Sequence, residues 1–404
     1  MVKEALMKKF FRLSGIIAFA IILGFLIAAC DNSNNNYNDD FDYKTTPQTP
    51  PASLGPSAPK PFNDITATQL VAGIKVGWNL GNTLDANGNP GASVSQLETA
   101  WGNPVTTKAH ITAIKDAGFN AIRIPVSWAK CADSNFNIRA DWMDRVTEVV
   151  NYAVDNDMYI LLNTHHDEGI FKFTSKEKAA SINAFRKIWI QIAGNFQNYD
   201  EKLIFEGLNE PRTKGSSAEW NGGTPEERGN LNDHYTVFVK TVRACGGNND
   251  KRFLMINTYG ASGLAVAMND LSIPADTAQN KIIVSYHAYE PYNFALNEGA
   301  GAVKTWSQSN SSDTSPITSR INQAYSSFIS KGIPVILGEF GALNRDNEPA
   351  RAAWVEFYVR SATQKGIKCF WWDDGGNFKL FNRSNNTFYF PQIKEGLIRG
   401  AATN

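Results

Sequence analysis

The sequence predicts a protein of the α/β class with one folded domain, a single (β/α)8 TIM barrel. Short apolar runs rich in β-branched residues alternate with longer amphipathic stretches, which is typical of βαβ units and a parallel sheet. Eight such runs fit into about 340 residues, a usual size for this barrel. Polar side chains also recur where the runs end, and in such a barrel the C-terminal strand ends surround one shared pocket.

The eight apolar runs define the expected strands. These strands are Gly73–Asn79, Ala121–Pro125, Tyr159–Thr164, Leu203–Leu208, Phe253–Asn257, Ile282–His287, Val335–Glu339 and Lys368–Trp372. The amphipathic stretches between them predict the helices Lys108–Ala117, Asp141–Asp155, Lys176–Phe196, Asn230–Ala244, Ile317–Lys331 and Arg351–Lys365. The helical pattern is weakest in the fifth crossover, Leu264–Leu271. No second domain fits in what remains.

The chain begins with the pattern of an export signal, residues 1–29. Basic residues precede an apolar run from Leu13 to Ala29, and small residues come directly before Cys30. The segment Leu26–Cys30 resembles a bacterial lipobox, in which the cysteine carries the lipid. The alternative is a transmembrane anchor, because 17 apolar residues are at the lower limit for spanning a bilayer. We expect an exported bacterial lipoprotein, at the cell surface or in the outer membrane or periplasm, that contacts the membrane only through this anchor.

The segment that follows, residues 30–61, is rich in Asn, Asp, Ser, Thr and Pro and has few aliphatic residues. Such a composition buries too little apolar surface to offset the entropy of ordering. It predicts a disordered tether, and a folded catalytic domain from residue 62 to residue 404.

The charge balance and the cysteine pattern argue against nucleic acid and metal ions as partners. The 39 basic and 39 acidic residues cancel, and nothing resembles the basic stripe that nucleic acid binding requires. Apart from Cys30, the cysteines are Cys131, Cys245 and Cys369, with no CxxC pair and no metal-ligand spacing. We therefore expect no nucleic acid partner, no metal and no cofactor, and a monomer.

Two carboxylates stand out because each follows an apolar strand directly. Glu210 comes after the fourth strand and Glu339 ends the seventh, so the two should face each other across the barrel mouth. Such a pair suits glycoside hydrolysis, with one proton donor and one nucleophile about 5 Å apart if the reaction retains configuration. Asn209 could hydrogen-bond the sugar 2-hydroxyl. The alternative is a pair of salt-bridged strand-end residues, and Glu206, inside the fourth strand, is a rival carboxylate.

Seven motifs together resemble glycoside hydrolase family 5, over about residues 62–400. They are GWNLGNTLDA (77–86), RIPVSW (123–128), NTHH (163–166), GLNEP (207–211), HAY (287–289), GEFG (338–341) and FWWDDG (370–375). The resemblance implies a retaining double displacement, with Glu210 as acid/base and Glu339 as nucleophile. GWNLGNTLDA and the downstream WGNP (101–104) are most similar to subfamily 4, which holds cellulases and xyloglucanases.

The resemblance also assigns supporting roles. Arg123 is similar to the residue that keeps the nucleophile ionised, and Tyr289 to the hydroxyl that orients it. His165 and His287 are similar to the pocket histidines, and Trp372 to the platform under the sugar ring, while Trp371 should point away because successive strand residues face opposite sides. The alternative for both histidines is a structural hydrogen bond.

Further residues are expected to bind substrate. Asn82 and Asp85 resemble residues that bind the hydroxyls of the next sugar, although simple Asx turn chemistry is an equal alternative. His166 is also expected to bind substrate. The string His165-His166-Asp167-Glu168 lacks the helical HExxH spacing of a metal site. Trp220 lies on the loop 212–228, which is long enough to line a cleft.

These assignments predict an endo-acting enzyme that cleaves β-1,4-glucan backbones, namely cellulose, xyloglucan or mixed-linkage glucan. One alternative is a β-mannanase or xylanase on the same scaffold. The other is a non-catalytic surface lipoprotein that binds glycans, against which the intact pair Glu210 and Glu339 argues.

Overall fold

A computed structural model of the protein describes residues 54–402. The expected signal peptide, Cys30 and most of the expected tether therefore lie outside the described residues. Among residues 54–402, no helix combines the length and the apolar character needed to cross a membrane.

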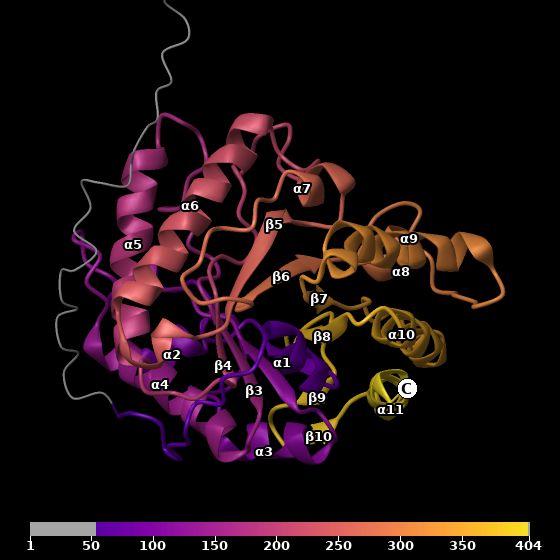
Figure 1. The fold of residues 1–404 in the computed structure, drawn as a ribbon. Coiled ribbons are helices and arrows are strands. Elements are labelled where there is room, and N and C mark those ends of the chain that lie inside the picture. Colours follow the sequence, from indigo (N-terminus) through magenta and orange to yellow (C-terminus); the bar gives the residue numbers. More distant parts are fainter. Residues whose placement is uncertain (1–53, 403–404) are drawn as a thin grey trace, which may run out of the picture. The chain divides into compact units, whose positions relative to one another are not determined.

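Eight parallel strands close into a barrel in chain order, β1 to β8, which confirms the predicted fold (Figure 1). The strands are β1 (Gly77–Leu80), β2 (Ala121–Ile124), β3 (Tyr159–Asn163), β4 (Leu203–Glu206), β5 (Leu254–Ser262), β6 (Ile282–His287), β7 (Val335–Phe340) and β8 (Lys368–Asp373). Most strand residues are buried because the barrel interior covers one face of each strand and the helices cover the other.

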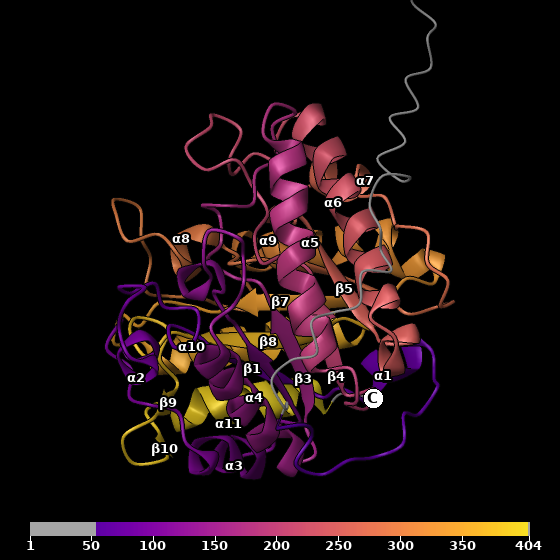
Figure 2. The ribbon, with the colours of Figure 1, turned by 90° about the vertical axis from the view of Figure 1, so that its left-hand side faces the viewer.

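The helices surround the barrel, and α5 and α6 lie side by side along one flank (Figures 1 and 2). They are α1 (Ala67–Gly73), α2 (Val94–Glu98), α3 (Lys108–Asp116), α4 (Ala140–Asp155), α5 (Lys178–Asn195), α6 (Pro225–Ala244), α7 (Ala265–Asn269), α8 (Tyr292–Ala295), α9 (Ser311–Ser327), α10 (Glu348–Thr363) and α11 (Pro391–Ala401). Short 3-10 turns occur at Ala129–Cys131, Gly247–Asp250 and Ile329–Lys331. The fifth crossover, where the helical pattern of the sequence is weakest, contains the short helix α7.

Helix α1 closes the N-terminal end of the barrel and was not expected from the sequence. Thr66 and Gln69 cap it reciprocally. Leu70 and Val71 belong to one buried cluster with inward-facing strand residues such as Ile204. The first strand was therefore predicted to begin too early: it starts at Gly77, because α1 already extends to Gly73.

Other elements also differ from expectation: α9 begins at Ser311 rather than Ile317, and β5 extends to Ser262 rather than ending at Asn257. Helix α6 begins at Pro225 rather than Asn230, because Thr224 and Glu227 form a capping box and a proline is favourable in the first helical turn. Between β8 and the last helix α11 lies an antiparallel hairpin, β9 (Phe381–Asn382) with β10 (Thr387–Phe388).

The end of the predicted tether is attached to the barrel. The Ser57 hydroxyl donates to the Asp155 carboxylate at 2.6 Å, and the Gly55 carbonyl accepts from the Tyr199 hydroxyl at 2.8 Å. Lys60 pairs with Asp157 at 2.5 Å. Polar residues of the expected tether therefore bind the end of α4 and its neighbours, and the domain boundary expected at residue 62 stays a prediction.

Candidate active site

A buried arginine inside the barrel binds polar side chains from several strands. Arg123, on β2, has no solvent exposure, and its guanidinium donates to Glu206 at 2.6 and 3.0 Å and to Glu339 at 2.6 Å. It also donates to Asn79 at 3.0 Å and Asn209 at 2.7 Å. Burial alone would lower the pKa of Arg123, but the charges of Glu206 and Glu339 outweigh it and raise the pKa. Arg123 therefore stays charged and links β1, β2, β4 and β7.

Glu339 lies near the end of β7 and has two donors. Arg123 Nη1 binds one carboxylate oxygen at 2.6 Å, and the Tyr289 hydroxyl donates to the other at 3.0 Å. Burial, with the charges of Glu339 and Glu210, raises the pKa of Tyr289 well above its ordinary value, so Tyr289 stays a donor. Both oxygens are thereby oriented, which suits a nucleophile that must attack from a fixed direction.

Glu210 follows β4, and His287 lies between it and Glu339. His287 Nδ1 is 3.0 Å from Glu210 Oε1 and 3.6 Å from Glu339 Oε2. One oxygen of Glu210 and one of Glu339 lie within 4.8 Å of each other. Such a short spacing is typical of the carboxyl pair of retaining glycosidases rather than inverting ones.

The position of His287 depends on a glycine on the neighbouring strand. A Cβ atom at Gly338 would lie 2.8 Å from Ser285 Oγ and 3.2 Å from His287 Nε2. A side chain at position 338 would collide with Ser285 and press on the imidazole of His287. Close packing therefore explains the glycine at this position of the GEFG motif.

The electrostatics of Glu210 combine opposing effects. Burial raises its pKa, but the hydrogen bond and charge of His287, with the charges of Arg212 and His166, outweigh burial and lower the pKa. An acid must hold its proton when substrate is present. A sugar over the carboxylate adds to its burial, the effect that favours the protonated form.

Aromatic side chains from the ends of β3 and β8 stack on each other. The rings of His165 and Trp372 are parallel, 3° apart in orientation, with centroids separated by 5.7 Å. Trp371 packs outward against Phe340 and Trp354, as the strand alternation predicts. Trp372 is thus left on the inner side of β8, where the sequence places the platform for the sugar ring.

His165 presents a ring N–H to the site. The side-chain oxygen of Asn163, Oδ1, accepts the Val126 N–H, so the side-chain NH2 of Asn163 faces His165 Nδ1 at 3.1 Å. Nδ1 therefore accepts a hydrogen bond and the proton sits on Nε2. Burial lowers the pKa of His165 well below its ordinary value, so the ring is neutral.

The side chains of Asp85, His165 and His166 converge, with ligand atoms within 4.8 Å of one another. His165 Nε2 lies 3.9 Å from Asp85 and His166 Nε2 lies 4.0 Å from it. A metal would need the lone pair of His165 Nε2, which carries the proton in this arrangement. The group suits a sugar hydroxyl better than a cation.

Asp85 and Asn82 sit on the loop after β1. Asp85 is fully buried, and its oxygens accept the backbone N–H groups of Asn82 at 3.0 Å and Thr83 at 2.7 Å. Of the two alternatives for Asp85, these contacts support turn chemistry that holds the loop. Asn82 is half-buried with a positive φ of 54°, which asparagine tolerates. Its contact with a sugar stays a prediction.

Trp220 lines a cleft of about 620 Å³ together with Glu210 and His287. Tyr292, Leu296 and Arg320 form other parts of its lining. The Arg212 guanidinium lies 4.4 Å from the centre of the Trp220 ring. Trp220 was expected from the sequence, whereas Arg212 was not, although its place directly after the GLNEP motif was a signal.

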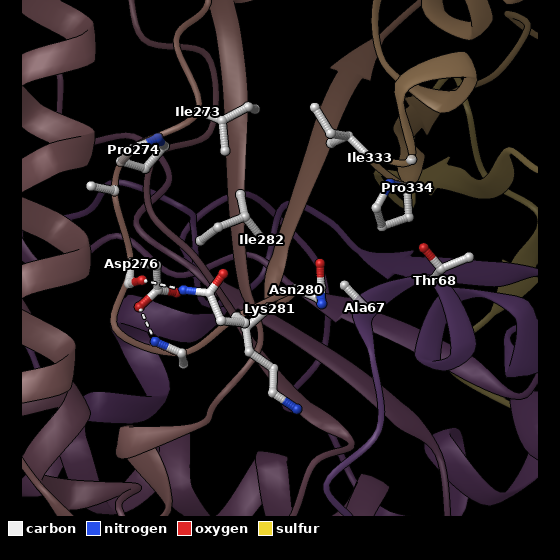
Figure 3. Close-up of a pocket in the computed structure, with 14 residues that line it drawn as sticks. Ala67, Thr68, Ile273, Pro274, Asp276, Asn280, Lys281, Ile282, Ile333 and Pro334 are labelled. Atoms are coloured by element: carbon white, nitrogen blue, oxygen red, sulfur yellow. Dashed lines mark hydrogen bonds between the residues drawn. The ribbon is translucent and has the colours of Figure 1, made fainter.

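A second hollow, of about 400 Å³, lies at the other end of the barrel (Figure 3). It is lined by Ile282, which begins β6, and by Pro334, which precedes β7. Its charged residues already have partners, since Lys281 pairs with Asp64 and Asp276 with Arg243, each at 2.6 Å. It takes no part in the site of Glu210 and Glu339.

The fold and the carboxylate pair define the class of protein. A (β/α)8 barrel with two carboxylates within 4.8 Å of each other after β4 and on β7 is the arrangement of a retaining glycoside hydrolase. The chain belongs to the cellulase family, glycosyl hydrolase family 5, whose sequence profile matches residues 84–377. The family predicted from the seven motifs is thereby confirmed.

Solved structures agree with the subfamily. The chain is 46% identical to a GH5-4 broad specificity endoglucanase from Ruminococcus champanellensis with bound cellotriose, with a TM-score of 0.81, over 84% of this chain and 100% of that one. It is 40% identical to a GH5 family lichenase from Caldicellulosiruptor sp. F32, with a TM-score of 0.80, over 85% of this chain and 97% of that one.

Among characterised relatives, Endoglucanase A of Clostridium longisporum is 43% identical over 346 residues, 83% of this chain. The cellulase/esterase CelE of Acetivibrio thermocellus is 43% identical over 349 residues, 84% of this chain. The matched region spans 66% of the first relative and 41% of the second.

Proposed function

We propose that this protein is a retaining endo-β-1,4-glucanase. The observation that carries the proposal is the placement of Glu210 and Glu339 within 4.8 Å of each other, with Arg123 and Tyr289 on the second and His287 between them. The names of the relatives, endoglucanase and lichenase among them, support a β-glucan as substrate.

The reaction proceeds in two displacements. Glu339 attacks the anomeric carbon while Glu210 gives its proton to the glycosidic oxygen, so the carbon–oxygen bond breaks and the leaving chain departs as an alcohol. Glu210, now a carboxylate, then takes a proton from a water whose oxygen replaces Glu339 at the same carbon. Two inversions give net retention of configuration.

The enzymatic claim is tested on polymers. The purified protein is incubated with carboxymethylcellulose, and both reducing ends and viscosity are followed; an endo-acting enzyme lowers viscosity early, when few ends have formed. Initial rates on xyloglucan, lichenan, xylan and mannan rank the substrates. No reducing ends on any β-glucan or β-mannan would leave the non-catalytic glycan-binding alternative, and a preference for mannan or xylan would overturn the glucan assignment.

We further propose that the chain is an exported lipoprotein, anchored through Cys30 and joined to the barrel by the polar segment that follows. The apolar run that ends at Ala29 before this cysteine supports the proposal. In a bacterial host, the wild-type protein should fractionate with membranes and incorporate labelled palmitate, whereas Cys30→Ser should do neither. Equal membrane association of both forms would instead favour a transmembrane anchor.

A further inference from the structure

Another buried arginine joins the loop after β1 to the loop after β8. Arg383 comes directly after β9 and is 6% exposed. Its Nη1 donates to the Gly81 carbonyl at 3.0 Å and to the Thr83 hydroxyl at 2.7 Å, and its Nη2 donates to the Asp373 carbonyl at 2.7 Å. The Gly81 N–H donates to that same Asp373 carbonyl at 3.1 Å. Arg383 therefore holds together the C-terminal ends of the first and the last strand, where the barrel closes.

The carboxylate of Asp373 brings the chain back to this junction after β8. Its Oδ2 accepts the Leu380 N–H at 3.1 Å and the Phe381 N–H at 2.9 Å, and also the Trp78 indole N–H at 3.0 Å. Its Oδ1 lies 3.7 Å from Arg383 Nη2. A buried guanidinium without a counter-charge is costly. Asp373 therefore both shapes the return of the chain and balances the charge of Arg383.

An asparagine of the WGNP motif strengthens the same junction. Asn103 Nδ2 donates to the Asn82 carbonyl at 2.9 Å and to the Asp374 carbonyl at 3.0 Å, one residue further along each loop than the contacts of Arg383. A Cβ atom at Gly375, whose φ is 71°, would lie 1.9 Å from Asn103 Oδ1. Only a glycine at position 375 therefore lets Asn103 reach both loops.

The two joined loops touch Trp372. A Cβ atom at Gly81 would lie 2.8 Å from Trp372 Cη2, so the Gly81 backbone packs directly against the indole. Trp372 also precedes Asp373 in the chain, so the hydrogen bond from Arg383 to the Asp373 carbonyl fixes the backbone beside the ring. A shift of either loop would therefore move the indole that is expected under the sugar ring.

We propose that Arg383 and Asn103 are positioning residues for hydrolysis: by joining the loop after β1 to the loop after β8, they keep the Trp372 indole in place under the reacting sugar. The inference rests on the proposed glycosidase activity, since only then does Trp372 carry a sugar. A misplacement of about 1 Å caused by a remote residue can cost about 10²-fold in rate. Residues that do not touch the substrate can therefore still set kcat.

The test uses two substrates, cellohexaose and β-cellobiosyl fluoride, whose fluoride leaves without needing a proton. Arg383→Lys keeps the positive charge but loses the planar fork that reaches both loops. It should lower kcat about ten-fold for both substrates, because both place a sugar over Trp372. The loss on the fluoride excludes an effect through the proton donor Glu210. KM for cellohexaose should change by less than about two-fold, since its other sugars bind elsewhere.

Arg252→Lys is the matched control, because Arg252 has no solvent exposure and also binds backbone carbonyls. Its guanidinium donates at 2.8 to 3.0 Å to the carbonyls of Phe196, Tyr199, Asp200 and Leu203. Leu203 begins β4, so this arginine lies at the end of the barrel away from Glu210. Urea denaturation should show losses of stability of similar size for the two variants, but Arg252→Lys should leave kcat within about two-fold on both substrates.

A double-mutant cycle separates positioning of the indole from general loosening. Trp372→Ala removes the platform, so adding Arg383→Lys to it should lower kcat by less than about two-fold further. Asn103→Ala should lower kcat about five-fold in the wild-type background and likewise have little effect once Trp372 is replaced.

The outcomes are distinguishable. Undiminished losses of Arg383→Lys and Asn103→Ala in the Trp372→Ala background, or an equal kcat loss for Arg252→Lys, would overturn the inference while leaving the glycosidase assignment intact. A wild-type protein inactive on both substrates would overturn the assignment itself. If Arg383→Lys does not fold, the cycle of Asn103→Ala with Trp372→Ala decides.

Discussion

Replacing Glu206 by glutamine tests whether this rival carboxylate supports the site or performs the chemistry. Glu206 has no solvent exposure, and only donors face its oxygens. Arg123 Nε binds Oε2 at 2.6 Å, while Arg123 Nη2 at 3.0 Å and Asn257 Nδ2 at 2.6 Å bind Oε1. A glutamine has nearly the same shape, but its NH2 must meet a donor on whichever side it takes.

The expected loss in the free energy of unfolding follows from these contacts. Glu206→Gln removes the charge that balances a fully buried guanidinium and turns at least one hydrogen bond into a contact between donors. Breaking a buried ion pair by removing one partner costs about 3–5 kcal/mol. We therefore expect the free energy of unfolding to fall by about that amount.

Urea denaturation followed by circular dichroism measures the loss. Glu356→Gln is the control, because Glu356 pairs with Arg360 and Arg399 at the surface and should lose less than about 1 kcal/mol. A loss for Glu206→Gln as small as that of the control would refute the account of the Arg123 network. The folded variant should still hydrolyse β-cellobiosyl fluoride, and complete inactivity in a folded protein would make Glu206 a catalytic residue instead.

Three further predictions concern the catalytic pair, its orientation and pH. Glu339→Ala should nearly abolish turnover of all substrates, whereas Glu210→Ala should lose about 10²–10⁴-fold on cellohexaose and much less on β-cellobiosyl fluoride; equal losses would contradict the acid assignment. Tyr289→Phe removes a 3.0 Å hydrogen bond to the nucleophile and should lower kcat/KM about 10- to 100-fold, and an unchanged value would remove Tyr289 from the mechanism. Burial raises the pKa of Asp167 to about 6, so its stabilising contribution is full below about pH 4 and is lost as the pH rises through 6. The free energy of unfolding of the wild-type protein minus that of Asp167→Asn should therefore fall between pH 4 and pH 6, and a flat difference in urea titrations would contradict this.

The barrel and the meeting of Glu210 with Glu339 could be predicted from the sequence because both depend on local patterns. A parallel strand buried on both faces is a short apolar run, and Glu210 and Glu339 stand where two such runs end. Barrel topology then brings those ends together, which is why residues 129 positions apart could be paired without coordinates.

Features that depend on tertiary contacts were missed or left open. Helix α1 is short, and its apolar face is explained only by the barrel end that it covers. The contact between Arg212 and Trp220 depends on a loop that folds back to bring the two side chains together, and no periodicity in the sequence reveals such a return. The sequence leaves open whether Asp85 binds a sugar or holds its loop, because the burial of its carboxylate and its bonds to the backbone of residues 82 and 83 depend on the folded loop.

The stereochemistry of hydrolysis tests the central claim most directly. The short separation of Glu210 and Glu339 leaves no room for a water between nucleophile and anomeric carbon, so the first product must keep the β configuration. Proton NMR during the first minutes of cellohexaose cleavage should show the β-anomer of the new reducing end before mutarotation produces the α-anomer. Early appearance of the α-anomer would contradict the double displacement and the roles given to both carboxylates.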